Sequence, residues 1–170
     1  MTLLLVATLV VSSLELRAEV IDGHVLQVLL VPRGPMPIVT TGRTVLGCYI
    51  EVDVLDSRGD RIGWLGPRAS CPTPTLAQFR ALSPDGPQDP GGAEVFGARF
   101  DLLAPGRVRI GPNEEGLQPG QEYQLVVTYH DDDANGLSEK DKALLRKKYG
   151  KFWSGPIEVK GGPIAFRCPS

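Results

Sequence analysis

The segment from Asp131 to Asp141 places oxygen-bearing side chains at alternating positions. Asp131, Asp133 and Asn135 stand at the first, third and fifth positions, and Gly136 follows at the sixth. With this spacing the alternate side chains converge on one centre while the glycine permits a sharp turn, which suits the oxygen-rich coordination of calcium. Asp141 serves as the closing carboxylate if one residue is missing from the second half of the loop. The sequence therefore predicts a calcium site formed by Asp131, Asp133, Asn135 and Asp141.

The same segment also fits a polar turn followed by a capped surface helix. Ser138 and Asp141 have the spacing of a capping box, which accounts for both residues without a metal. Acidic Glu139 at the start of the helix and the basic residues 146–148 at its end suit the helix dipole, and Gly150 provides a stop. The sequence predicts a helix from Ser138 to Tyr149 under either interpretation, so the calcium site and the capped turn remain alternatives.

The first 18 residues have the composition of a signal peptide. An apolar run from Leu3 to Val11 has the length of the hydrophobic region of a leader and is too short to span a bilayer. Ala18 offers a small residue at which cleavage can occur. We therefore predict a signal peptide over residues 1–18 and one mature domain over residues 19–170. The alternative is that this stretch contains a buried first strand.

The three cysteines are compatible with export, because secreted proteins commonly form disulfides. Cys48 alternates with apolar residues in an expected strand from Thr44 to Leu55, where a free thiol packs like a small hydrophobic side chain. Cys71 lies in a proline-rich loop and Cys168 lies near the C-terminus. We therefore predict a Cys71–Cys168 disulfide, although spacing alone does not determine the connectivity.

Short strands separated by turn residues indicate an all-β fold. The chain contains 20 Gly and 15 Pro without a fixed period, which suits many turns better than a helical bundle. In the stretch from Thr44 to Leu55, apolar residues alternate with Glu51 and Asp53, as expected for a sheet with one buried face. Together these features predict an antiparallel β-sandwich with one short helix in a long loop between the last two strands.

The run from Leu117 to Tyr129 resembles the turn and F strand of fibronectin type III and bacterial immunoglobulin-like domains. In those families a Leu-x-Pro-Gly-x-x-Tyr turn precedes a strand of alternating apolar residues, and here Pro119, Gly120 and Tyr123 occupy the matching positions. The resemblance implies an immunoglobulin-like sandwich and a tyrosine corner, in which the Tyr123 hydroxyl bonds to a nearby backbone group. In the same way, residues 131–141 resemble the calcium loop of EF-hand and dockerin modules.

Signatures of catalysis are lacking in the sequence. The only histidines, His24 and His130, belong to no nucleophile elbow or zinc-type pair, and no phosphate-binding glycine-rich loop precedes a helix. We therefore predict that the chain is not an enzyme and needs no cofactor, apart from the calcium considered above. The alternative is a secreted hydrolase that uses carboxylates from the loop beginning at Asp131 together with Glu114 and Glu115.

These patterns predict a secreted, periplasmic or cell-surface module for binding, adhesion or structure. The long connection from His130 to Lys151 would carry the docking surface, because loops at the end of a sandwich commonly bear function. The partner would be a protein or a surface. A net charge of −2 gives no electrostatic reason to expect nucleic acid, and the expected mature chain contains no membrane span. A calcium-stabilised surface module is a further alternative.

Overall fold

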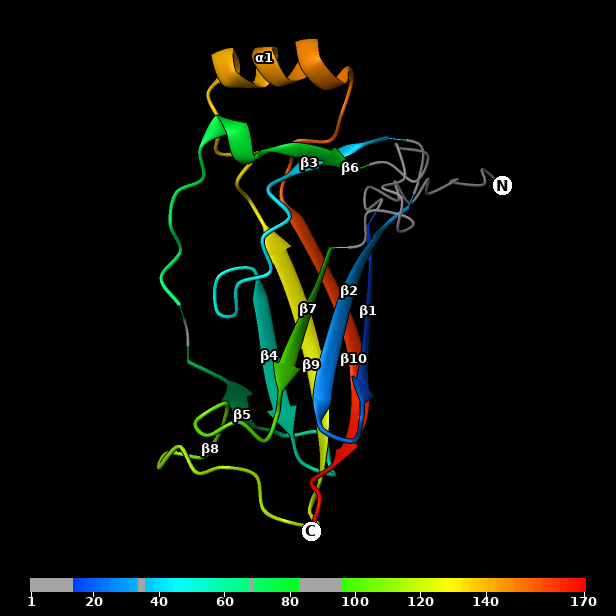
Figure 1. The fold of residues 1–170 in the computed structure, drawn as a ribbon, viewed down its shortest axis with the longest axis vertical. Coiled ribbons are helices and arrows are strands. Elements are labelled where there is room, and N and C mark those ends of the chain that lie inside the picture. Colours follow the sequence, from blue (N-terminus) through cyan, green and yellow to red (C-terminus); the bar gives the residue numbers. More distant parts are fainter. Residues whose placement is uncertain (1–13, 34–35, 68, 83–95) are drawn as a thin grey trace, which may run out of the picture.

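The computed structural model describes residues 14–33, 36–67, 69–82 and 96–170. Two antiparallel sheets pack face to face, and one helix lies between the last two strands, which confirms the predicted all-β sandwich (Figure 1). The strands of the two sheets are β1 (Leu14–Ile21), β2 (Val25–Pro32), β4 (Ile50–Leu55), β5 (Arg61–Leu65), β7 (Phe96–Asp101), β8 (Val108–Ile110), β9 (Glu122–Asp131) and β10 (Ile157–Arg167). We call these two sheets the sandwich body.

The smaller sheet has the order β1-β2-β7, and its first strand begins inside the predicted signal peptide. β1 pairs with β2 along all eight of its residues, and Leu14 and Leu16 are buried in the core. Cleavage after Ala18 would cut this strand and remove both leucines. Residues 14–18 of the predicted signal peptide thus belong to a strand of the sandwich, and cleavage after Ala18 stays a prediction. The rest of the predicted signal peptide, residues 1–13, lies outside the described residues.

The larger sheet has the order β10-β9-β4-β5-β8. In β9 every second residue from Tyr123 to Asp131 is buried, so the period-two pattern of the sequence turns one face of this strand toward the core. The buried side chains of β9 and β4 meet those of β1 and β2 in one hydrophobic cluster, which includes Leu26, Val28, Ile50, Leu125 and Val127. This cluster holds the two sheets together.

Four smaller elements cover one end of the body, and we call them the cap. They are β3 (Ile38–Thr40), β6 (Arg80–Leu82), the short 3-10 helix η1 (Leu76–Gln78) and α1 (Glu139–Tyr149). β3 pairs with β6 and α1 lies across them, far from the C-terminus (Figure 1). The predicted helix is confirmed: the Ser138 side chain accepts a hydrogen bond from the Asp141 N–H at 3.1 Å, and Gly150 ends the helix.

The disulfide differs from the predicted one, because it joins Cys48 to Cys71. The Ala69 N–H donates to the Leu46 carbonyl, which brings the loop after β5 back to the turn that holds Cys48. Cys168 lies instead beside Gln121, at the far end of β9, about 25 Å along the strand from the Cys48 turn. A disulfide needs Cα atoms within about 7 Å. Cys168 is therefore a buried free thiol.

The tyrosine corner expected at Tyr123 is present. Its ring is buried in the core, and its hydroxyl accepts a hydrogen bond from the Gln118 N–H at 2.9 Å. This contact ties the turn before β9 to the edge of the sandwich. Among the described residues, no helix combines the length and the apolar character that crossing a membrane requires.

Candidate functional site

A buried polar network joins the cap to the sandwich body, and Asp131 lies at its centre. The Asp131 side chain is only 3% exposed. Its Oδ2 accepts hydrogen bonds from the hydroxyls of Thr40 and Tyr129, and its Oδ1 accepts one from the Asp133 N–H at 2.9 Å. Burial raises the pKa of the Asp131 carboxyl, although the three hydrogen bonds oppose this shift. This predicted calcium ligand therefore connects β9 to β3.

Asp133 belongs to the same network and also points toward hydroxyl groups. Its Oδ2 accepts hydrogen bonds from the Tyr49 hydroxyl at 2.6 Å and from the Thr41 hydroxyl at 3.2 Å. Burial raises the pKa of Tyr49, and the bond to Asp133 adds to the effect. Burial likewise raises the pKa of Tyr129 far above its usual range. Both tyrosines therefore stay protonated and act as donors to the two carboxylates at neutral pH.

The other two predicted calcium ligands lie elsewhere. Asn135 is exposed in the turn before α1, while the Asp141 carboxylate accepts a hydrogen bond from the Ser138 hydroxyl at 2.7 Å. Within the part of the chain that the structure describes, no group of three or more His, Cys, Asp or Glu side chains is arranged to hold a metal ion. The structure thus brings Asp131 and Asp133 together but leaves Asn135 and Asp141 apart, and calcium binding stays a prediction.

The inner face of α1 anchors the helix to the cap. Leu145 is buried in one small cluster with Val39 of β3, Phe79 and Ala134. Tyr149 adds a hydrogen bond of 3.1 Å from its hydroxyl to the Phe79 carbonyl. Because these contacts come from three separate segments of the chain, α1 is held at a defined position over β3 and β6.

The outer face of α1 is basic around one apolar residue. Leu144 is 49% exposed, the largest exposed fraction among the large hydrophobic side chains that the structure describes. Lys140 and Lys147 lie four residues before it and three residues after it, so all three side chains share one face of the helix. Lys148 and Lys151 are exposed nearby. The composition of residues 139–151 indicates this charge, but only the packing of Leu145 shows which face is outermost.

The carboxylates considered for a hydrolase lie at opposite ends of the larger sheet. Glu114 and Glu115 precede β9, whereas Asp133 follows it. A ten-residue strand spans about 30 Å, so the two sets do not line a common cleft. Glu114 instead pairs with Arg109.

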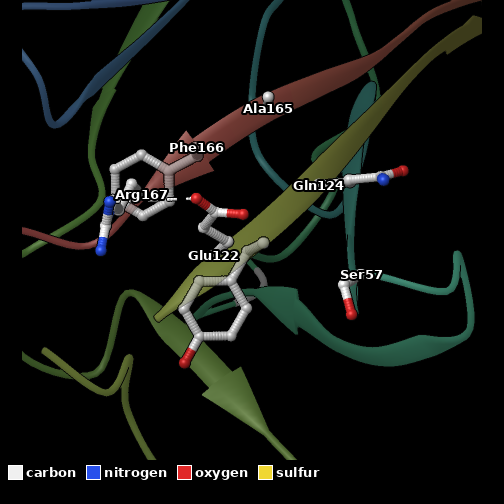
Figure 2. A pocket seen from close by; sticks show the side chains of 7 residues that line it. Ser57, Glu122, Gln124, Ala165, Phe166 and Arg167 are labelled. Atoms are coloured by element: carbon white, nitrogen blue, oxygen red, sulfur yellow. Dashed lines mark ion pairs between the residues drawn. The ribbon is translucent and has the colours of Figure 1, made fainter. Parts of the chain in front are cut away.

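Two hollows lie on the sandwich body. The first has a volume of about 400 Å³ and lies near the C-terminus (Figure 2). Its lining includes Gln124 and Ser57, together with Glu122 and Arg167, which form a loose ion pair of 4.0 Å. The second, of about 530 Å³, is lined by Arg61, Trp64, Pro67, Arg109 and Glu114. Trp64 belongs to β5 and is half-buried. In β5 the side chains alternate between the two faces of the sheet. Because its neighbours Gly63 and Leu65 are buried, the Trp64 side chain lies on the outer face.

Comparison with protein-family models, with curated proteins and with solved structures finds no match for this chain. The fold and the side-chain geometry therefore carry the functional argument. The resemblance to fibronectin type III and bacterial immunoglobulin-like domains stays a prediction.

Proposed function

We propose that this protein is an exported, non-catalytic binding module that docks an acidic protein partner on the outer face of α1. The observation that carries the proposal is the exposed Leu144 between Lys140 and Lys147 on a helix whose other face is anchored. Amphipathic helices commonly dock in this way, with an apolar anchor and polar residues around it. The tyrosine corner and the two-sheet arrangement support an immunoglobulin-like module as the scaffold.

The charge of this surface supports an acidic partner. Residues 139–151 contain six Lys or Arg and two Asp or Glu, a net charge of +4 in a chain of net charge −2. The remainder of the chain therefore carries −6, so the basic face is a local feature. Lys140 and Lys147 belong to none of the ion pairs found among the described residues, whereas Arg146 pairs with Glu139. Their charges are available to a partner, and complementary charge accelerates association.

The small apolar area favours a protein over a lipid surface. Helices that lie in membranes bury a broad apolar face, with several large side chains along one side. The outer face of α1 offers one leucine, because Leu145 is turned inward and Ala143 is small. A single anchor surrounded by cations suits a pocket with an acidic rim.

The disulfide supports export. Disulfides persist in oxidising compartments and are rare in the cytosol of most organisms. The Cys48–Cys71 bond closes a segment with a sequence separation of 23 residues at the end of the body that carries the cap. We propose that the protein is periplasmic, secreted or displayed at the cell surface.

Charge reversal on α1 tests the docking surface. Deletion of the helix is unsuitable, because it would expose Val39 and Phe79. The double variant Lys140→Glu/Lys147→Glu changes only the exposed face. A partner captured by the tagged protein from its own cells would be identified by mass spectrometry, purified and titrated by calorimetry. We expect the variant to bind at least about tenfold more weakly, with a smaller dependence on salt.

Lys160→Glu on β10 is the matched control, because this lysine is exposed on the body outside α1 and its reversal should leave the affinity unchanged. Leu144→Ser should weaken binding without altering the salt dependence. Equal losses in the control and the α1 variant would overturn the proposal. Binding of the wild type to anionic vesicles without any protein partner would also overturn it.

A further inference from the structure

The hollow beside Trp64 lies on the outer face of the larger sheet, at the end of the body away from the cap. β5 and β8, which carry its aromatic and basic residues, lie far from α1 in Figure 1. None of its lining residues belongs to the docking surface on α1. The hollow therefore raises a separate functional question.

Strand pairing sets Trp64 between charged neighbours. Trp64 of β5 stands directly opposite Asp53 of β4 on one side and Arg109 of β8 on the other. Residues that stand opposite each other in a sheet project from the same face. Since Gly63 and Leu65 are buried toward the core, Trp64 projects outward and is only half-buried. The sheet thus presents an indole ring flanked by an acid and a guanidinium group.

The charged groups around the indole are held in place by ion pairs. The Arg61 Nε contacts the Asp53 Oδ1 at 2.6 Å, and Arg109 pairs with Glu114. Gly66 permits the close approach of Arg109, because a Cβ atom at this position would come within 2.8 Å of the Arg109 Nε. Each positive charge that the described lining residues bring to the hollow therefore has a negative partner, and these residues leave no excess charge to attract an anion.

We propose that this hollow binds a neutral carbohydrate. The Trp64 ring and Pro67 offer an apolar surface against which the C–H face of a pyranose can stack. Arg61 and Arg109 supply N–H donors, while Glu114 supplies carboxylate acceptors, so both roles of a sugar hydroxyl are met. A buried anion would have to compete with Asp53 and Glu114 for the guanidinium groups. The balanced charges favour a neutral ligand for this reason.

The proposal goes beyond the docking function and stands independently of it. A protein-docking helix at one end and a carbohydrate-binding hollow at the other would let the chain bridge a polysaccharide and a protein partner. Experiments can disprove the docking surface and the carbohydrate site separately, because the two surfaces share no residue.

Tryptophan fluorescence tests the hollow directly. The chain has two tryptophans, so Trp153→Phe leaves Trp64 as the only reporter. This full-length variant would be titrated with hexasaccharides of β-1,4-linked glucose, xylose, mannose and N-acetylglucosamine, and with hexagalacturonate as the anionic comparison. We expect a saturable change with at least one neutral probe at millimolar concentration or below. In calorimetry, Trp64→Ala should weaken that binding at least about tenfold.

Controls separate this result from unfolding and from failure of the cap. Glu114→Gln removes one acceptor at an exposed position and should weaken binding several-fold, so it provides a second test if Trp64→Ala lowers the melting midpoint. Lys140→Glu/Lys147→Glu should leave carbohydrate binding unchanged. The proposal is overturned if no neutral hexasaccharide binds, if only hexagalacturonate binds, or if Trp64→Ala and Glu114→Gln both retain the wild-type affinity.

Discussion

The sandwich body and the cap are stabilised in different ways. The body has an extended apolar core shared by both sheets, in which Leu26 and Val127 are completely buried. The cap has a small cluster around Leu145. It is joined to the body through Ile38 of β3, which lies in the large core, and through Asp131, a buried carboxylate that accepts hydrogen bonds from hydroxyl groups. We therefore expect the body to keep its fold when the cap is loosened, while the packing of Leu145 and the polar junction together hold α1 in place. The position of the proposed docking face on α1 therefore depends on fewer contacts than the sheets of the body do.

Truncating a buried leucine in each region compares the stabilities of the body and the cap directly. We expect the largest change in the free energy of unfolding from this test. Leu26→Ala in β2 should lower the free energy of unfolding by about 3 kcal/mol, because it leaves a cavity in the shared core. Leu145→Ala should loosen α1 and leave the melting of the body nearly unchanged. Thermal melts combined with hydrogen exchange at the α1 amides measure both effects. Equal losses of midpoint would mean that cap and body unfold as one unit.

Removal of the disulfide tests how much stability the boundary between the body and the cap contributes. The double variant Cys48→Ser/Cys71→Ser should lose about 3 kcal/mol of stability, because the bond restricts a loop with a sequence separation of 23 residues in the unfolded chain. Denaturant unfolding measures the loss. Peptide mapping without reduction should recover the Cys48–Cys71 link, and a Cys71–Cys168 peptide would contradict the structure.

The polar junction should make stability depend on pH. The folded pKa of Asp131 is raised above the ordinary value of 3.8, so folding favours the protonated carboxyl. Its contribution to stability is present at low pH and is lost as the pH rises from about 3.8 through the raised folded pKa. In Asp131→Asn the amide keeps the same shape and does not titrate. As the pH rises, the melting midpoint of the wild type should therefore fall relative to that of Asp131→Asn.

Melting curves across the acidic range test this junction. The matched control is Asp132→Asn, because Asp132 is adjacent but exposed. A midpoint difference for Asp131→Asn that does not change with pH would show that this carboxyl titrates normally in the folded protein.

Calcium should have the smallest effect on either region. Asp131 and Asp133 accept hydrogen bonds from the hydroxyls of Thr40, Tyr129 and Tyr49, and a metal would have to displace these hydroxyls. We expect melting curves with excess calcium and with chelator to superimpose. A calcium-dependent rise of the midpoint that Asp133→Ala removes would instead establish the metal site that the sequence predicts.

Local sequence signals predicted much of the body and the helix. The alternation in β9 identified the buried face, and Ser138, Asp141 and Gly150 identified both ends of α1, because caps and period-two burial depend on neighbouring residues. The expected strand from Thr44 to Leu55 was right about its buried residues but wrong about its start. Residues 47–49 form a turn, and β4 begins at Ile50.

The candidate sites depended on contacts between distant segments. Asp131 was predicted as a metal ligand from the spacing of its neighbours, yet its partner Thr40 lies 91 positions away along the chain. Trp64 acquires its charged surroundings from β4 and β8, and Cys48 meets Cys71 because a loop returns to its turn. The sequence alone determined the periodicity, the caps and the tyrosine corner, since these are local. Only the tertiary structure decided which side chains meet, because strand order and register bring together residues that no spacing relates.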